Sequence, residues 1–390
     1  MKSLITMLLG TSCMIVLATS ASASPPFNPV SAIQDVPLVA FEDTGVFTRI
    51  HPTKMAIGKD RKIYFNSSLA VVYRVDEEGT LEKVSVLPNA GGIPDDDFTI
   101  GITFDQPGNL YVSNITGIYE ISARDLRRQT LEQPVAATKI ADIPADLQFP
   151  MGLVADRRGH LYLSDIFGGA IFKIDIDTGQ ATSWFSDPAL AAPVVIPSDN
   201  LFGIGFGITD IAIGNRGRYL YFGTQETHRI YRLGINRDGS AGALEELAHL
   251  PNLAFNGVSF DMVGKKVYLS VPWEFFENGI QTLTNPVEVA GSIWMIDIRQ
   301  LKRDGFATPV ELIRDVDVGT AVDVVSGFHF GGGPEQADRL YVSDGSFDTF
   351  FWLNGDPNGA PLPDPTPEGG IPFPQNTYHG AIRTLELVDY

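Results

Sequence analysis

Short apolar runs alternate with polar turns along almost the whole chain, and one combination of the two recurs. Residues 150–165, PMGLVADRRGHLYLSD, join an apolar run, an Asp/Gly turn and a second run centred on tyrosine. Such runs, bounded by turn residues, are typical of two β-strands in a hairpin. The combination occurs six times, at residues 55–66, 102–114, 150–165, 211–223, 259–270 and 327–344. The pattern therefore predicts an architecture of equivalent β units.

Each hairpin is followed by further apolar segments that enlarge the unit. A third run follows most copies, at 71–76, 117–122, 170–175, 229–234 and 292–297, and a weaker fourth run such as 82–87 leads onward. Four short strands repeated about every 50 residues indicate a β-propeller, whose radial sheets pack around a channel. The sequence thus predicts an all-β fold, a six-bladed β-propeller of four-stranded antiparallel blades. The alternative, a β-sandwich with many turns, does not account for a recurring motif.

One position of the repeat, at the start of its first strand, is usually glycine. Glycine occupies it at 101, 152, 257 and 327, whereas Lys54 and Asp210 occupy it in the other two copies. The ring is expected to close where the C-terminal segment 381–387 meets the N-terminal segment 36–42. We expect residues 24–390 to form a single propeller domain with long loops at 272–291 and 345–380.

The first 23 residues have the pattern of a secretory signal peptide. Lys2 precedes the apolar run 4–18, and small residues at 21–23 form a cleavage signal; the run is too short to span a membrane. The only cysteine, Cys13, lies inside this segment, so cleavage would leave no thiol for a disulfide, a thiolate metal site or a nucleophile. We therefore expect a secreted or periplasmic protein with no membrane span.

The charge balance bears on the class of partner. The chain has 28 basic and 47 acidic residues, a net charge of −19. Such a surface repels the phosphates of nucleic acids and anionic membranes. We expect instead a small-molecule substrate, or a carbohydrate or protein ligand.

The long connections predict which face of the propeller carries function. The turns inside the hairpins are mostly short, whereas the insertions at 272–291 and 345–380 lie on the opposite rim. Long loops held by a rigid scaffold often carry function, although Pro/Gly-rich insertions also occur as disordered decoration. Aromatic residues such as Trp273 and Trp352 suit contact with a carbohydrate or a protein.

The residue before each motif position is expected to point toward the channel mouth. These residues are Thr53, Ile100, Met151, Thr209, Asn256 and Ser326. Oxygen atoms of Asn256 and Asp210, with Asp97 if its loop folds inward, predict a site for a divalent metal, Ca²⁺ above all. The alternative is that these side chains cap strand ends and bond to the backbone, as such residues routinely do.

Two further candidates concern catalysis. His329 lies on an expected inner strand near the channel, and with Asp210 it is a candidate catalytic residue. Glu226 and His228, in a short loop on the same face, are a candidate acid/base pair. The alternative is that His329 is a structural residue and that Glu226 and His228 are polar side chains of a hairpin turn exposed to solvent.

The segments FNGVSFDMVGKKVYLS and PMGLVADRRGHLYLSD, with the blade rhythm of most of the chain, resemble the SMP-30/gluconolactonase/paraoxonase-like six-bladed propellers and their NHL-like relatives. This resemblance implies one divalent ion, usually Ca²⁺, held at the channel mouth by a Glu and several Asn/Asp residues, and hydrolysis of lactones or related esters there. Asn256 matches the family's Asn-Gly ligand motif. The chain departs from the pattern at Thr53, where the family has its Glu, and at Met151.

Two functions follow as hypotheses. The first is a secreted hydrolase of a small lactone or ester, for which a metal at the channel mouth is a candidate cofactor. The second is a non-catalytic secreted propeller that binds a carbohydrate, peptide or protein through its long loops.

Overall fold

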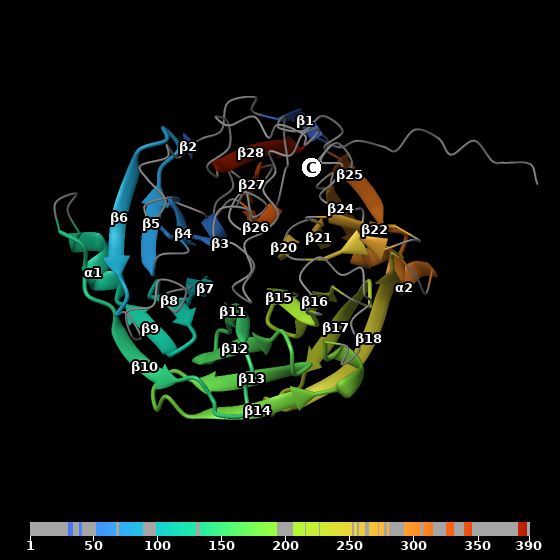
Figure 1. The fold of residues 1–390 in the computed structure, drawn as a ribbon, viewed down its shortest axis with the longest axis horizontal. Helices are drawn as coiled ribbons and strands as arrows, with labels where there is room; N and C mark the ends of the chain where they lie inside the picture. The colour runs from blue at the N-terminus through green and yellow to red at the C-terminus, as the bar shows by residue number, and fades with distance from the viewer. Residues whose placement is uncertain are drawn as a thin grey trace, which may run out of the picture.

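The computed structural model describes residues 30–33, 39–40, 52–67, 70–88, 99–129, 133–192, 206–214, 216–225, 227–251, 253–255, 257–261, 265–271, 273–276, 279–280, 292–304, 307–314, 325–330, 339–344 and 381–387. Within these ranges most residues lie in β-strands. The strands form separate sheets arranged around a central channel (Figure 1). The fold is therefore an all-β propeller, as the repeat predicts.

Five sheets are four-stranded antiparallel blades in which each strand pairs with the next of its repeat. They consist of β3 (Pro52–Ile57), β4 (Ile63–Ser67), β5 (Val71–Val75) and β6 (Leu81–Val86); β7 (Thr99–Phe104), β8 (Leu110–Asn114), β9 (Gly117–Ile121) and β10 (Thr138–Asp142); β11 (Pro150–Ala155), β12 (His160–Asp165), β13 (Ala170–Asp175) and β14 (Ala181–Ser186); β15 (Ile208–Gly214), β16 (Tyr219–Thr224), β17 (Arg229–Ile235) and β18 (Ala241–His249); and β20 (Gly257–Asp261), β21 (Lys266–Val271), β24 (Ser292–Asp297) and β25 (Val310–Arg314). These blades confirm the predicted hairpins and third strands.

The remaining sheet joins the two ends of the chain. It contains β26 (Val325–Phe330), β27 (Arg339–Asp344) and β28 (Ala381–Leu387), together with β1 (Val30–Ile33) and β2 (Val39–Ala40). Val39 pairs with Ile382, which confirms that segments 36–42 and 381–387 meet, and Val30 pairs with Leu387. The predicted count of six four-stranded blades is wrong: the described residues form five, and this sheet has five strands because β28 pairs with two short N-terminal strands.

The first strand of each repeat is the innermost strand of its sheet. These strands pack side by side in the order β3, β7, β11, β15, β20 and β26, and β26 packs again on β3 (Figure 1). β3 and β15 are therefore three steps apart in either direction. They face each other across the channel.

The tyrosine of the repeat explains the aspartate in the hairpin turn. It is buried in all six copies, at Tyr64, Tyr111, Tyr162, Tyr221, Tyr268 and Tyr341. The Tyr111 hydroxyl donates to Asp105 over 3.1 Å, and the same carboxylate accepts from the turn amides of Gly108 and Asn109, each over 2.7 Å. One aspartate thus closes the turn and satisfies a buried hydroxyl, as Asp60 does for Tyr64 over 2.7 Å.

The other elements are short. They are the helices α1 (Ala123–Arg128) and α2 (Ile298–Asp304), the 3₁₀ turn Pro188–Leu190, and a small sheet of β19 (Leu253–Ala254), β22 (Trp273–Phe276) and β23 (Gly279–Ile280). β22 and β23 fall in the predicted loop 272–291, whereas loop 345–380 and residues 1–23 lie outside the described residues. In the described part of the chain, no helix is both long and apolar enough to cross a membrane.

The role of the turn aspartate gives a first prediction. We expect Asp105→Ala to lower the free energy of unfolding by about 1–3 kcal/mol, because it leaves the buried Tyr111 hydroxyl and the Asn109 amide without their acceptor. Urea denaturation measures the change. Asp142→Ala is the matched control, since the Asp142 side chain is 88% exposed and its ion pair lies at the surface. Equal, small losses in both variants would contradict the assignment.

Candidate functional site

Gly101 and Gly152, two of the motif glycines, lie where neighbouring inner strands approach each other closely. A Cβ atom on Gly152 would lie 2.6 Å from the Ile211 nitrogen and 2.8 Å from the Asp210 Cα atom. Real Cβ atoms do not come this close to backbone, so the packing of β11 on β15 requires glycine there. The glycine amides donate to serine hydroxyls of the second strand, in the pairs Gly101–Ser113, Gly152–Ser164 and Gly257–Ser270.

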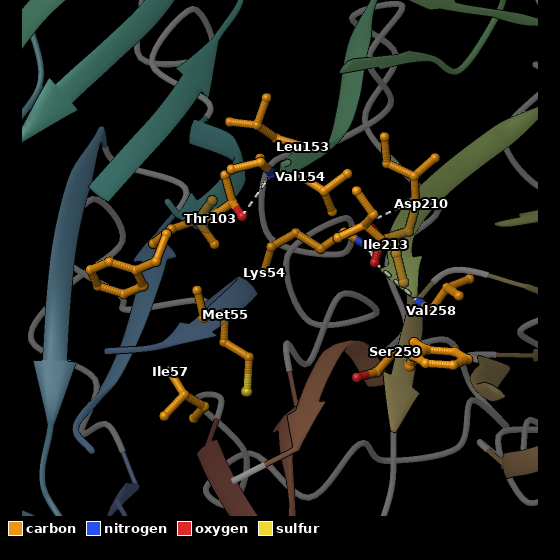
Figure 2. A pocket seen from close by; sticks show the side chains of 18 residues that line it. Lys54, Met55, Ile57, Thr103, Leu153, Val154, Asp210, Ile213, Val258 and Ser259 are labelled. Atoms are coloured by element: carbon orange, nitrogen blue, oxygen red, sulfur yellow. Dashed lines mark hydrogen bonds and ion pairs between the residues drawn. The ribbon is translucent and has the colours of Figure 1, made fainter. Parts of the chain in front are cut away.

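The two motif positions that are not glycine carry opposite charges and meet. Lys54 lies in β3 and Asp210 in β15, on opposite sides of the channel. The lysine side chain extends across the channel, as Figure 2 shows, and its Nζ atom lies 3.2 Å from Oδ2 of Asp210. The two side chains are only 6% and 13% exposed. A nearly buried ion pair therefore bridges the channel.

The carboxylate of Asp210 is held in place by backbone amides as well. Its Oδ1 atom accepts a hydrogen bond from the Ile211 amide over 2.9 Å, and Oδ2 accepts one from the Val258 amide of β20 over 3.2 Å. Burial raises the pKa of Asp210, while the Lys54 ammonium group opposes that rise. Burial likewise lowers the pKa of Lys54, and Asp210 opposes it. Each charge thus offsets part of the desolvation cost of the other.

The pair lines a cavity of about 240 Å³ in the channel. Its walls come from β3, β7, β11, β15 and β20, and Figure 2 shows the lining side chains around Lys54. Thr103 and Ser259 add hydroxyl groups, and the lining residues also include apolar ones, among them Met55, Ile57, Leu153, Val154 and Ile213. Polar atoms make up the larger part of the surface that faces the cavity, and its volume has room for a small molecule.

The contacts of Asp210 do not fit a divalent ion. Ca²⁺ takes six to eight oxygen ligands, and here the Lys54 ammonium group lies against the carboxylate where such an ion would bind. Among the described residues, no group of three or more His, Cys, Asp or Glu side chains could hold a metal. The predicted ligands Asn256 and Asp97 lie outside the described residues, so their part in a metal site stays a prediction.

Two other candidates have mainly structural contacts. Thr209, expected at the channel mouth, is buried and donates through its hydroxyl to the Phe255 carbonyl over 2.7 Å. His228 has a φ of 55°, and its Nδ1 atom donates to the Leu253 carbonyl over 3.0 Å. Burial lowers the pKa of His228. Its expected partner Glu226 lies outside the described residues, so the acid/base pair stays a prediction.

For the remaining candidates the structure gives only the strand in which each residue lies. His329 and Ser326 lie in β26, the innermost strand of the closing sheet, and His329 pairs with Tyr341 in its register. Thr53 lies in β3, Met151 in β11 and Trp273 in β22. Trp352 lies outside the described residues.

Lys54 is not among the candidates predicted from the sequence, where it stands only as a departure from the motif glycine. The available signal was that the two departures among the six motif positions are of opposite charge. Because these positions meet around one channel, opposite charges at two of them predict an ion pair.

No protein-family model matches the chain, and no curated protein matches its sequence. Solved structures do match. A gluconolactonase from Xanthomonas campestris has 12% identity and a TM-score of 0.52, over 94% of this chain and 99% of that one. A calcium-binding protein, regucalcin, from Agrobacterium tumefaciens has 13% identity and a TM-score of 0.52, over 90% and 95%.

A luciferin-regenerating enzyme has 13% identity and a TM-score of 0.54, over 87% of this chain and 93% of that one. At this level of identity, likeness shows the fold alone. The structure neighbours include gluconolactonase- and regucalcin-like propellers, in agreement with the resemblance found in the sequence.

The ion pair gives a second prediction. We expect Lys54→Met or Asp210→Asn alone to lower the free energy of unfolding by about 3–5 kcal/mol. Lys54→Met leaves a buried carboxylate without a compensating charge, and Asp210→Asn leaves a buried ammonium group without one. The double variant should lose clearly less than the sum of the two single losses, because neither charge remains. Urea unfolding of all four proteins measures this coupling. Additive losses would show that the two groups do not interact.

Proposed function

We propose that the chain hydrolyses a small lactone or ester in the channel cavity, with Asp210 and Lys54 as the reacting pair. The observation that carries this proposal is a carboxylate and an ammonium group 3.2 Å apart, both lining a cavity of about 240 Å³. Burial shifts the pKa of the carboxyl toward the range of a general base. The fold likeness to a gluconolactonase supports the choice of reaction.

In the proposed reaction, Asp210 accepts a proton from a water molecule, whose oxygen forms a bond to the carbonyl carbon of the substrate. The carbonyl oxygen becomes negatively charged, and the Lys54 ammonium group stabilises it by a charge-assisted hydrogen bond. The C–O bond to the leaving alcohol then breaks. Asp210 returns its proton to that alkoxide, so an ester gives a carboxylic acid and an alcohol, and a lactone gives a single hydroxy acid.

The amides of Ile211 and Val258 position the base for this step, since they fix both carboxylate oxygens. Because both side chains are nearly buried, the effect of the ammonium group on the oxyanion is stronger than it would be in bulk water. No step of this reaction uses a divalent ion. We further propose that residues 1–23 direct export and that residues 24–390 form one domain.

A binding function at the loop face is the second candidate. The small sheet supports it, because β19 directly precedes β20 and β22 closely follows β21. The insertion at 272–291 is therefore partly built into strands at the rim where β20 begins. In this alternative a carbohydrate, peptide or protein binds there, and no substrate is turned over. Binding of such a ligand without hydrolysis of any lactone or ester would favour it.

The proposed function predicts specific losses of activity on a panel of lactones and aryl esters. We expect Asp210→Asn to abolish turnover, because the amide cannot accept the proton from water. Lys54→Met should lower kcat by about 10²–10³-fold, as loss of an oxyanion donor does, and Lys54→Arg should retain more activity. Asp142→Asn and Lys83→Met, at exposed sites, are the matched controls. Full activity in Asp210→Asn would contradict the assignment.

The pH dependence of kcat/KM gives a further prediction. Because Asp210 acts as its carboxylate and burial raises its pKa, activity should fall with acid at a pH above the ordinary range of an aspartate. The Lys54 ammonium group lowers the pKa of Asp210, so its removal raises that pKa further. The residual activity of Lys54→Met should therefore have its acid limb at higher pH than the wild type. A limb that stays fixed, or that moves to lower pH, would contradict the role of Asp210 as base.

A further inference from the structure

The carboxylate of Asp210 is arranged to receive a cation. Two backbone amides, from β15 and β20, fix its two oxygens, and Asp210 lines the channel cavity. A buried carboxylate without a compensating charge is strongly disfavoured. The site therefore needs a positive charge close to Oδ2, which either a bound ion or a side chain can provide.

The chain provides this charge from the opposite side of the channel. Lys54 occupies a motif position that is glycine in most repeats, and its ammonium group lies 3.2 Å from Oδ2. Its backbone is anchored as well, because the Lys54 amide donates to Oδ1 of Asn66 over 2.8 Å. Both side chains are nearly buried, so the ammonium group is part of the channel wall and not a surface cation.

We propose that the Lys54 ammonium group is the resident cation of this channel, in the place where a divalent ion would bind Asp210, and that removal of this group creates a Ca²⁺ site. The catalytic meaning of the inference rests on the proposed function, since the ammonium group then stabilises the oxyanion without a metal. The binding part stands independently, because it concerns only which cation lies against the carboxylate.

The cavity has room for the exchange. Shortening or neutralising Lys54 leaves the fixed carboxylate facing a space of about 240 Å³ that already borders two hydroxyl groups, those of Thr103 and Ser259. Ca²⁺ accepts carboxylate, neutral oxygen and water ligands together. One carboxylate with water and neutral oxygens makes a weak site, so millimolar Ca²⁺ is the appropriate probe.

Thermal unfolding of the full chain tests the inference, in EDTA and then in millimolar Ca²⁺. The wild type should show no rise in midpoint in Ca²⁺ that Asp210→Asn removes. Lys54→Met should unfold at a lower temperature in EDTA and gain about 2 °C or more in Ca²⁺, because an ion bound only by the native state stabilises it. Lys54→Met/Asp210→Asn should not respond to Ca²⁺. Lys83→Met, which removes an exposed lysine, should behave as the wild type.

A second variant keeps the test decisive if Lys54→Met does not fold. Lys54→Gln adds a neutral carbonyl oxygen beside the carboxylate and should respond to Ca²⁺ at least as strongly. A wild-type midpoint that rises in Ca²⁺ and loses this rise in Asp210→Asn would overturn the inference. So would the lack of any Ca²⁺ response in both Lys54 variants. No substrate enters these measurements, so absence of hydrolase activity would refute the proposed function and leave this result unchanged.

Discussion

The close approach of the inner strands is the constraint on which the rest of this structure depends. At the motif position the next strand leaves no space for a Cβ atom beside Gly152, and the glycine amides are satisfied by serine hydroxyls of the second strand. The two residues with charged side chains at this position, Lys54 and Asp210, come from opposite sides of the channel and form an ion pair.

Stability alone does not account for a charged pair at this place. A buried ion pair has a large desolvation cost, and apolar residues of similar volume often serve a core as well or better. Here the pair borders a cavity, and the two amides bound to Asp210 orient the carboxylate toward it. A fixed carboxylate beside a fixed ammonium group is the arrangement that the proposed hydrolysis requires.

The likeness to solved structures supports the fold of this protein, whereas its function has to be inferred from the side chains of the site. The solved propellers with similar folds share 12–13% identity with the chain, which supports the architecture. A propeller serves many functions, so the function has to be argued from the side chains in the channel. In this channel the Asp210 carboxylate contacts the Lys54 ammonium group, whereas in a metal site it would contact a divalent ion. The proposed reaction therefore depends on an ammonium group and not on a metal.

The sequence by itself determined the repeating unit. Apolar periodicity, the turn aspartates and the buried tyrosines such as Tyr111 act between residues close in the chain, so the hairpins could be predicted from local pattern. The meeting of segments 36–42 and 381–387 could be predicted too, because a closed ring requires its ends to pair. Only the tertiary structure showed that β1 and β2 share one edge of β28.

Only the tertiary structure likewise decided the site. Thr209 fits the sequence pattern of a channel-mouth residue, yet its hydroxyl is bound to the Phe255 carbonyl. Lys54 and Asp210 are distant in the chain, and only a comparison of the six repeats marks their positions in the sequence. Their contact depends on how many inner strands separate β3 from β15 and on how closely those strands pack. Local sequence does not encode a distance across the channel, because that distance is a property of the closed ring.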